Sequence, residues 1–294
     1  MSVRRLRTVA RRRASVVLPL LAVLAVLPAC GAKTLRPERY AGRPDELFTA
    51  GVRELRAKRW DNAVAAFEKL TTDLAQRDTL LPRAHLLLGD ARTGRQEHLL
   101  AAQSYSRLAE GWPEDTLAPE ALLRSARSYQ KLWRSPEHDA GYGQTAQATF
   151  RTLMAVYPDA RQVKDAQREL ATLDQWFASK EYLTGYYYLR RKAYDPAIIY
   201  FKSVITNHPE TPRVRDAYLR LVESYRAIRY AEEATEACTA LRGKFAQDAE
   251  VRRVCPAPPA TPAARPVAAP AARPDSGSAR IVPADAASAP PRGA

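Results

Sequence analysis

A fixed spacing of small and aromatic residues constrains the fold of this chain more than any other feature. Within residues 179–212, Gly185, Ala197, Phe201 and Pro209 stand at positions 8, 20, 24 and 32 of one helix-turn-helix unit. Small residues let two antiparallel helices approach closely, and the aromatic side chain fills the space between neighbouring hairpins. Proline ends the second helix because it lacks an N–H and has a fixed φ. A single match is weak, so the prediction depends on recurrence.

The same spacing recurs in four other segments, with more or less degradation. Positions 8, 20 and 24 are held by Gly51, Ala63 and Phe67, by Gly89, Ala101 and Tyr105, by Ala126, Ala146 and Phe150, and by Val222, Ala234 and Cys238. This is the tetratricopeptide pattern. We therefore predict an all-α fold, a tetratricopeptide-repeat superhelix of about five helical hairpins, in which each hairpin needs to match only its neighbours.

Two segments depart from regular spacing. Between Ala126 and Ala146 there are eight residues more than expected, and the Pro and Gly content of residues 133–143 predicts an enlarged turn there. Residues 163–191 contain no proline and keep apolar residues three or four apart. This spacing predicts one long helix that leads into the fourth repeat.

The amino terminus has the pattern of an export signal. Arginines in the first 13 residues are followed by an uncharged apolar run over 14–29, which ends in Leu27-Pro28-Ala29-Cys30. That run is short for a membrane span but suits a secretory signal. Its end resembles the bacterial lipobox, which implies cleavage before Cys30 and acylation of Cys30. The alternative is an ordinary signal peptide with an incidental cysteine. Gly31 after the cysteine, rather than Asp, is usual for lipoproteins sent to the outer membrane.

These features divide the chain into five parts. We expect a lipoprotein signal peptide over 1–29, a polar tether over 30–43, repeats 1–3 over 44–158, and the long helix with repeats 4–5 over 159–255. Residues 256–294 contain ten prolines among 39 residues. With no apolar periodicity to bury, this tail is expected to be disordered, either as an inert spacer or as a basic segment that contacts the cell wall.

The net charge of +14 does not indicate a nucleic-acid partner. Six of the 46 basic residues lie in the export signal, and the remainder of the chain has 40 basic against 32 acidic side chains. Spread over a whole chain, that excess is on the scale of solubility rather than of a phosphate-binding field.

No catalytic or metal-binding constellation is evident. His85, His98, His138 and His208 are widely spaced and form no HExxH or CxxC-type set. Residues 89–96 have the glycine spacing of a phosphate loop without its Lys and Ser/Thr. We therefore predict no enzyme activity, no cofactor and no metal, and expect function to lie in binding surfaces.

Cys238 and Cys255 remain after removal of the signal, and two states are open for them. They could pair as a disulfide in an oxidising compartment. Alternatively, Cys238 is a buried free thiol, since it stands at position 24 of its repeat, where it would act as a small hydrophobe.

The first helix of each hairpin should line the concave face of the superhelix. Apolar residues flanked by charges there suit an extended or helical peptide with aromatic side chains. The candidate peptide-binding residues are Phe48, Val52, Arg56, Arg83, Leu86, Asp90, Leu123, Arg127 and Lys131. For Phe48, Leu86 and Leu123, burial in the core is the alternative.

The order of these features is similar to the BamD family of outer-membrane assembly lipoproteins. The likeness covers about residues 25–245 and is strongest over 148–236, where Phe150, Leu153, Tyr157, Pro158 and Asp159 follow the family's F-x-x-L-x-x-x-Y-P-[DN] pattern. The resemblance implies a scaffold at the periplasmic face of the outer membrane. Its partners would be unfolded outer membrane proteins, bound by the amino-terminal repeats, and a BamA-like insertase, docked by the carboxy-terminal repeats.

The resemblance also implies where docking would occur. The candidate residues are Tyr194, Tyr200, Lys202, Arg215 and Arg220; an arginine is expected where this chain has Tyr200, and Lys202 is a candidate substitute. The competing hypothesis is a different tetratricopeptide lipoprotein, which scaffolds cell-wall synthesis or exopolysaccharide export, because this repeat serves many partners.

Overall fold

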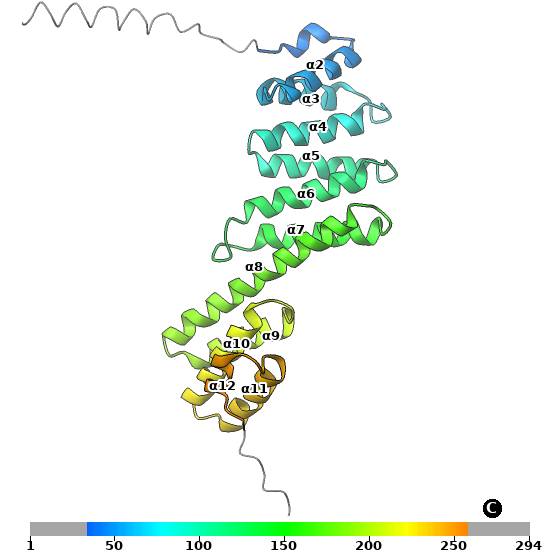
Figure 1. Cartoon of the computed structure of the whole chain (residues 1–294). Helices are drawn as coiled ribbons and strands as arrows, with labels where there is room; N and C mark the ends of the chain where they lie inside the picture. Colours follow the sequence, from blue (N-terminus) through cyan, green and yellow to red (C-terminus); the bar gives the residue numbers. More distant parts are fainter. Residues whose placement is uncertain (1–33, 258–294) are drawn as a thin grey trace, which may run out of the picture.

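A computed structural model describes residues 34–257, and all regular structure in this range is helical. After η1 (Pro37–Tyr40), the α-helices follow in the order α2 (Pro44–Arg56), α3 (Trp60–Asp73), α4 (Leu81–Gly94), α5 (His98–Gly111), α6 (Ala118–Leu132), α7 (Gly141–Val156), α8 (Val163–Arg190), α9 (Tyr194–Asn207), α10 (Arg213–Ala227), α11 (Ala231–Lys244) and α12 (Ala249–Val254). Successive helices from α2 to α7 lie side by side in one ladder, and α8 crosses obliquely from it to a second group formed by α9–α12 (Figure 1). The prediction of an all-α array of about five hairpins is confirmed.

In the three hairpins that have glycine at position 8, this residue lies against the aromatic residue at position 24. A Cβ atom on Gly89 would lie 2.3 Å from the Tyr105 ring, and one on Gly185 would lie 2.9 Å from the Phe201 ring. Tyr105 is 2% exposed and Phe201 is fully buried. The repeat pattern therefore encodes one physical contact, in which an aromatic ring lies on the backbone of the facing helix.

Replacement of Gly89 by alanine tests this contact. A methyl group there overlaps a buried ring, and overpacking of this kind costs about 1–3 kcal/mol of unfolding free energy. Gly243→Ala is the matched control because no atom apart from its chain neighbours and the nearby backbone of its own helix lies within 4 Å of its added Cβ; this change should stabilise by up to about 1 kcal/mol through helix propensity. Urea unfolding measures both. Equal effects at the two sites would contradict the packing argument.

The turn within the third hairpin differs from the others. Each of the other four hairpin turns contains a residue with positive φ, namely Lys58, Gln96, Lys192 and Arg229. The third turn instead runs over residues 133–140, and residues 141–143, which we expected in this loop, form the first turn of α7. A Cβ on Gly143 would lie 2.2 Å from the buried Trp133 ring. The glycine thus serves close helix packing, which composition alone does not distinguish from loop formation.

The long helix α8 belongs to two cores. Ala166 and Leu173, near its start, are buried with α6 and α7, whereas Ala178 and Leu189 are buried with α9 and α10. Between these two regions Phe177 contacts Trp133 at 4.7 Å and stacks on His208 at 6.5 Å between ring centroids. The two groups of helices are therefore joined by a continuous helix and a packed aromatic contact.

A titratable side chain, His208, lies at this junction between two carboxylates. Its Nδ1 lies 2.6 Å from Asp174 Oδ1 and its Nε2 lies 3.7 Å from Glu181 Oε2. The nearby carboxylates of Glu181 and Asp174 raise the pKa of His208, although burial opposes this. A raised pKa stabilises the fold most below the unfolded pKa of about 6.5, and this stabilisation is lost as pH rises through the folded pKa.

We therefore expect the melting temperature to fall as pH rises from about 6 to above the folded pKa of His208. Thermal unfolding at a series of pH values measures this. His208→Gln, which cannot ionise, should remove that part of the pH dependence. An unchanged profile in this variant would assign the dependence to other groups.

Residues 34–43, which we expected to belong to a tether, are folded against the first hairpin. The backbone N–H of Leu35 donates to Asn62 Oδ1 at 3.0 Å, and the side chains of Leu35 and Tyr40 pack on the core of α2 and α3. This packing was not predicted from the sequence, because only two of these ten residues, Leu35 and Tyr40, are large and apolar. The described chain therefore begins at a defined place on the first repeat.

The carboxy-terminal end is closed by α12 and a disulfide. Cys238 on α11 is bonded to Cys255 just after α12, with 5.3 Å between the Cα atoms. Asp248 caps α12 by accepting hydrogen bonds from the N–H groups of Glu250 and Val251. Cys238 occupies position 24 of its repeat as expected, and in the structure it is bonded rather than free.

Candidate peptide-binding and docking surfaces

The three apolar candidates on the inner face are core residues. Phe48 and Leu86 are 9% exposed and Leu123 is 2% exposed. Phe48 packs edge-on against Phe67 with 5.8 Å between ring centroids. These three side chains therefore do not form open sites for a peptide. The alternative, burial in the core, is correct, because they fill space between neighbouring helices. Val52 is half-buried against the same core as Phe48.

Several charged candidates are held by contacts within the chain. Arg124 donates to Asp90 at 2.6 Å, and the Tyr105 hydroxyl donates to Asp90 at 2.7 Å. The Arg83 guanidinium lies 5.4 Å from the Phe48 ring centroid. Asp90 thus tightens the packing of α4, α5 and α6. Arg56 is exposed at the end of α2.

Arg127 and Lys131 are brought together in a groove of about 710 Å³ between α6 and α8. The groove is lined by Arg127, Gln130, Lys131, Trp133, Arg134, Glu169 and Trp176. Arg127 pairs with Glu169 at 2.9 Å and with Asp165 at 3.3 Å, whereas Lys131 and Arg134 are exposed. Basic groups beside an aromatic side chain suit a ligand that carries a carboxylate and an aromatic ring.

The contribution of α8 to this groove was missed by sequence reasoning. Trp176 and Glu169 lie more than 30 positions after Lys131, and the pattern assigned α8 only as a connection. The available signal was Trp176 itself, a large aromatic residue on the long helix, which packs edge-on against Trp133 at 5.4 Å.

The five docking candidates do not form one surface. Tyr200 stacks on Tyr188 of α8 at 5.7 Å, and Tyr194 is half-buried against the core. Lys202 lies on the opposite flank of α9 and lines a pocket of about 220 Å³ with residues of α10 and α11. Lys202 is therefore separated from Tyr200 by the width of the helix, which argues against its substitution for an arginine at position 200.

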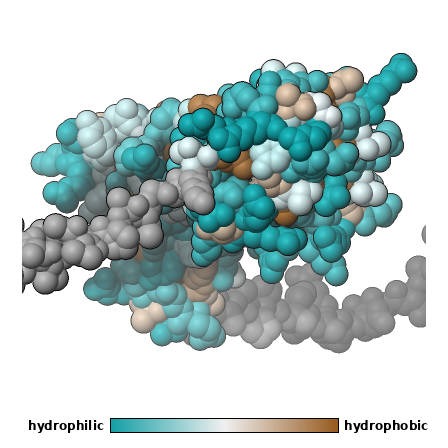
Figure 2. Space-filling view, turned by 90° about the horizontal axis from the view of Figure 1, so that it is seen from above, coloured by the Kyte–Doolittle hydropathy of each residue, from teal (hydrophilic) through white to brown (hydrophobic). Residues whose placement is uncertain are grey.

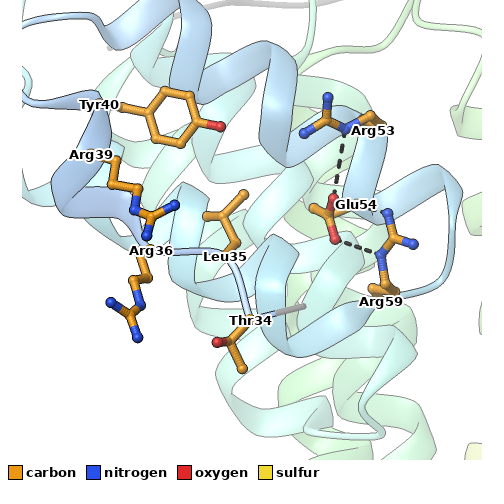
Figure 3. A pocket seen from close by; sticks show the side chains of 8 residues that line it. All are labelled: Thr34, Leu35, Arg36, Arg39, Tyr40, Arg53, Glu54 and Arg59. Carbon is orange, nitrogen blue, oxygen red and sulfur yellow. Dashed lines mark hydrogen bonds and ion pairs between the residues drawn. The ribbon is translucent and has the colours of Figure 1, made fainter. Parts of the chain in front are cut away.

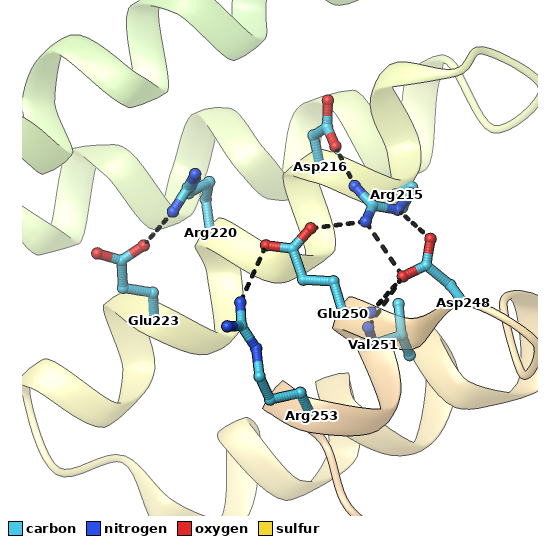
Figure 4. Close-up of polar contacts among 8 residues, drawn as sticks. All are labelled: Arg215, Asp216, Arg220, Glu223, Asp248, Glu250, Val251 and Arg253. Atoms are coloured by element: carbon cyan, nitrogen blue, oxygen red, sulfur yellow. Dashed lines mark hydrogen bonds and ion pairs between the residues drawn. The ribbon is translucent and has the colours of Figure 1, made fainter.

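Arg215 and Arg220 are engaged within the chain (Figure 4). Arg215 pairs with Asp216 at 2.8 Å, Asp248 at 2.7 Å and Glu250 at 2.6 Å, which holds α12 on α10. The hydrogen bond from Arg215, followed by those from the backbone of α12, lowers the pKa of Asp248 to about 2. Arg220 pairs with Glu223 at 2.8 Å. Arg215 thus has a structural role that the sequence pattern did not indicate.

A row of aromatic side chains on α8 and α9 was also missed. Tyr187 is 50% exposed and contacts Tyr188 edge-on at 5.4 Å, and Tyr188 in turn stacks on Tyr200. The Arg191 guanidinium lies 3.6 Å from the Tyr187 ring centroid. Ile199 on α9 is 66% exposed. The run of three tyrosines at 186–188 was the sequence signal for this aromatic row.

The described residues contain no arrangement that suggests a membrane span or a metal site. Between residues 34 and 257, none of the helices combines the length and apolarity needed to cross a bilayer. Over the same range, no group of three or more His, Cys, Asp or Glu side chains is placed to hold a metal ion. Cys30, the predicted signal peptide over 1–29 and the predicted tail from residue 258 onward lie outside the described residues.

Comparison with known proteins identifies relatives over most of the chain. The family described as "YfiO: Outer membrane lipoprotein" matches residues 40–241. The outer membrane protein assembly factor BamD of Caulobacter vibrioides is 27% identical over 76% of this chain and 73% of its own length. BamD of Rickettsia prowazekii is 24% identical over 64% of this chain and 74% of its own length.

Solved structures with a similar arrangement are tetratricopeptide-repeat proteins. The TPR domain of P58(IPK) is 12% identical, with a TM-score of 0.40, over 73% of this chain and 54% of that chain. The TPR2AB domain of yeast Sti1 is 15% identical, with a TM-score of 0.38, over 73% of this chain and 82% of that chain.

The family match begins at the last residue of η1 and ends within the last turn of α11, so it includes nearly all of the five hairpins. The family is one of assembly factors, which agrees with the prediction that the chain is not an enzyme. The chain belongs to the YfiO/BamD family of outer membrane lipoproteins.

Proposed function

We propose that this chain is the lipid-anchored scaffold of the machinery that folds and inserts β-barrel proteins into the outer membrane. The observation that carries the proposal is the family match over residues 40–241. On this proposal Cys30 is acylated, and the helical array lies at the periplasmic face of the outer membrane. The chain binds unfolded outer membrane proteins and docks the insertase, and it performs no chemistry itself.

The groove between α6 and α8 is the proposed site for the carboxy-terminal segment of an unfolded barrel protein. Its exposed basic groups, Lys131 and Arg134, suit a terminal carboxylate, and Trp176 suits an aromatic side chain of the same segment. Arg127 is neutralised by Glu169 and Asp165, so it orients the wall of the groove rather than serving as a free charge.

The aromatic row on α8 and α9 is the proposed docking surface for the insertase. Tyr187, Tyr188 and Tyr200 are contiguous, and Ile199 adds exposed apolar area beside them. Aromatic side chains and arginine are the residues that most often dominate binding energy in such interfaces. Arg191, held over Tyr187, supplies a basic group on this surface where Tyr200 replaces the arginine expected from the resemblance.

The anchoring part of the proposal is tested by Cys30→Ala. Without the lipobox cysteine the protein should be lost from the outer-membrane fraction, because the two or three buried acyl chains that provide stable attachment there are missing. Fractionation of cells followed by immunodetection measures this. Retention of the variant in the outer membrane would overturn the assignment of Cys30 as the anchor.

The groove is tested with a fluorescent peptide that copies the carboxy terminus of a barrel protein. Lys131→Glu should weaken binding roughly tenfold or more, since hydrogen bonds to charged groups contribute about 1.5–3 kcal/mol. The same peptide with an amidated terminus should show a similar loss for the wild-type chain. Arg151→Glu, an equal charge change at an exposed site on α7, is the matched control. Equal binding by all variants would exclude this groove.

Docking is tested by crosslinked pull-down from cell envelopes. Arg191→Glu combined with Tyr200→Ala should reduce recovery of the insertase, whereas Arg190→Glu combined with Thr206→Ala, which changes exposed positions on the same two helices, should not. Recovery of cell-wall synthesis or polysaccharide-export proteins in place of the insertase would overturn the proposed function.

A further inference from the structure

A basic pocket of about 370 Å³ lies where the described chain begins. Figure 3 shows Arg39 and Tyr40 on the η1 side facing Arg53, Glu54 and Arg59 near the α2–α3 turn, with Leu35 between them. Thr34 and Arg36 complete the lining. Four arginines and one carboxylate thus surround a single hollow.

The walls of this pocket are held in place by a hydrogen-bonded chain. Glu54 is 5% exposed and accepts from Arg59 Nε at 2.6 Å and from Asn62 Nδ2 at 2.8 Å. Asn62 Oδ1 accepts from the backbone N–H of Leu35. The hydrogen bond from Arg59 is the main reason that the pKa of Glu54 is lowered, so this carboxylate remains ionised. Glu54 therefore satisfies Arg59 and fixes the segment that carries Arg36 and Arg39.

Positive charge is left over in the pocket after this pairing. Within residues 34–257, neither Arg36 nor Arg39 has an ion-pair partner for its side chain, and Arg53 Nε lies 3.7 Å from Glu54. Between positions 34 and 59 the chain has seven basic and four acidic residues, with Glu38 as the acidic residue of η1. An anionic group whose oxygens accept several hydrogen bonds at once, such as a phosphate, is the ligand that such an excess of guanidinium groups favours.

The position of the pocket along the chain restricts the anion. Thr34 follows Cys30 by four residues, so an extended chain places the two Cα atoms at most about 14 Å apart. The face of the molecule seen from this end of the stack is mostly hydrophilic, with scattered apolar residues (Figure 2). Such a face suits the charged headgroup layer of a membrane rather than its acyl interior.

We infer that the pocket between η1 and the α2–α3 turn binds the phosphate of an anionic phospholipid headgroup beside the acylated Cys30. The inference rests on the proposed anchoring, which brings the pocket to the membrane surface. Headgroup binding by Arg39 and Arg53 makes a second attachment point, so the helical array is held in one orientation on the membrane instead of swivelling about its lipid. Tyr40 lies at the same edge, where an amphipathic ring suits the interface.

The test uses residues 30–294 with Cys30→Ser, so that no acyl chain contributes to membrane binding. This protein should sediment with vesicles of phosphatidylcholine containing 30% phosphatidylglycerol and much less with phosphatidylcholine alone. Arg39→Gln combined with Arg53→Gln should weaken binding about 25-fold, since each arginine near an anionic surface contributes roughly fivefold. Arg151→Gln combined with Arg190→Gln removes the same charge at exposed sites elsewhere and should change binding little.

Two further measurements identify the ligand and show whether a loss of binding comes from misfolding of the variant. Inorganic phosphate at the same phosphate concentration should not displace the protein from vesicles; displacement would overturn assignment to a lipid. For the acylated wild-type chain, hydrogen exchange of residues 34–56 should be slower in the phosphatidylglycerol vesicles than in phosphatidylcholine vesicles. The inference would be overturned if the two double variants lost vesicle binding equally. It would also be overturned if hydrogen exchange of residues 34–56 were equal in the two kinds of vesicle. Insertase recovery is measured separately, so the proposed function can stand if this site fails.

Discussion

Phe201→Ala is expected to remove about 3–5 kcal/mol of unfolding free energy, a large part of the stability of an ordinary domain. The Phe201 side chain is fully buried on α9 between Gly185 and Tyr182 of α8. Truncation would leave a cavity, because the backbone at Gly185 has no side chain that could move in. Chemical denaturation of the purified chain measures the loss.

The damage from Phe201→Ala should also be local. In a stacked array each hairpin contacts only its neighbours, so loss of one contact need not propagate to the far end. Hydrogen exchange should accelerate in α9, α10 and the end of α8 while α2–α5 keep their protection. Ile199→Ala on the same helix, at a site that is 66% exposed, is the control and should cost less than about 0.5 kcal/mol. Uniform acceleration along the chain would show instead that the array unfolds as one cooperative unit.

Removal of the disulfide is expected to cost about 3 kcal/mol, as estimated for a loop of this size. Cys238 and Cys255 are separated by 17 positions, and the loop between them contains α12. Val251 of α12 is fully buried, so release of the bond should also expose this residue through detachment of α12. The melting temperature of the wild-type chain should fall on addition of a reductant. In the Cys238→Ser, Cys255→Ser double variant it should start lower and not respond.

Two further readouts separate the effect of the bond from other causes. Thiol titration after unfolding without reductant should find no free thiol at these two positions in protein purified from the periplasm. Arg215→Gln should weaken α12 independently, because Arg215 joins Asp248 and Glu250 to α10. A melting temperature that is insensitive to reductant when both thiols are shown to be free would contradict a stabilising role for the disulfide.

The repeated packing contact was predictable from sequence, because three hairpins place a glycine at one fixed position and an aromatic residue at another. Gly185 and Phe201 show why this works: the pattern describes a contact within a single hairpin, and it survives wherever the chain continues to form hairpins. Residues 141–143 show the limit, since glycine permits both a loop and a close helix contact, and only the position of the Trp133 ring distinguishes them.

The candidate surfaces were less predictable from sequence, because each depends on side chains that a distant part of the chain places next to it. Arg127 and Lys131 were found from their position on a first helix, but their groove needs Trp176 from α8. Arg215 was assigned to docking on the family resemblance, whereas its partners Asp248 and Glu250 belong to a short helix that has no repeat pattern. Charge pairing between distant segments leaves no periodic signal in the sequence.

The continuity of α8 sets a fixed spacing between the proposed groove and the proposed docking surface. Trp176 and Tyr188 are twelve residues apart on the same helix, which corresponds to about 18 Å along its axis with no loop between them. On the proposed function, α8 keeps a bound substrate segment and the insertase at a fixed distance and a fixed angle from each other. One residue inserted between these positions would lengthen this part of α8 by only about 1.5 Å but would rotate one surface by about 100° relative to the other. The helix therefore fixes the relative orientation of the groove and the docking surface more strictly than their distance.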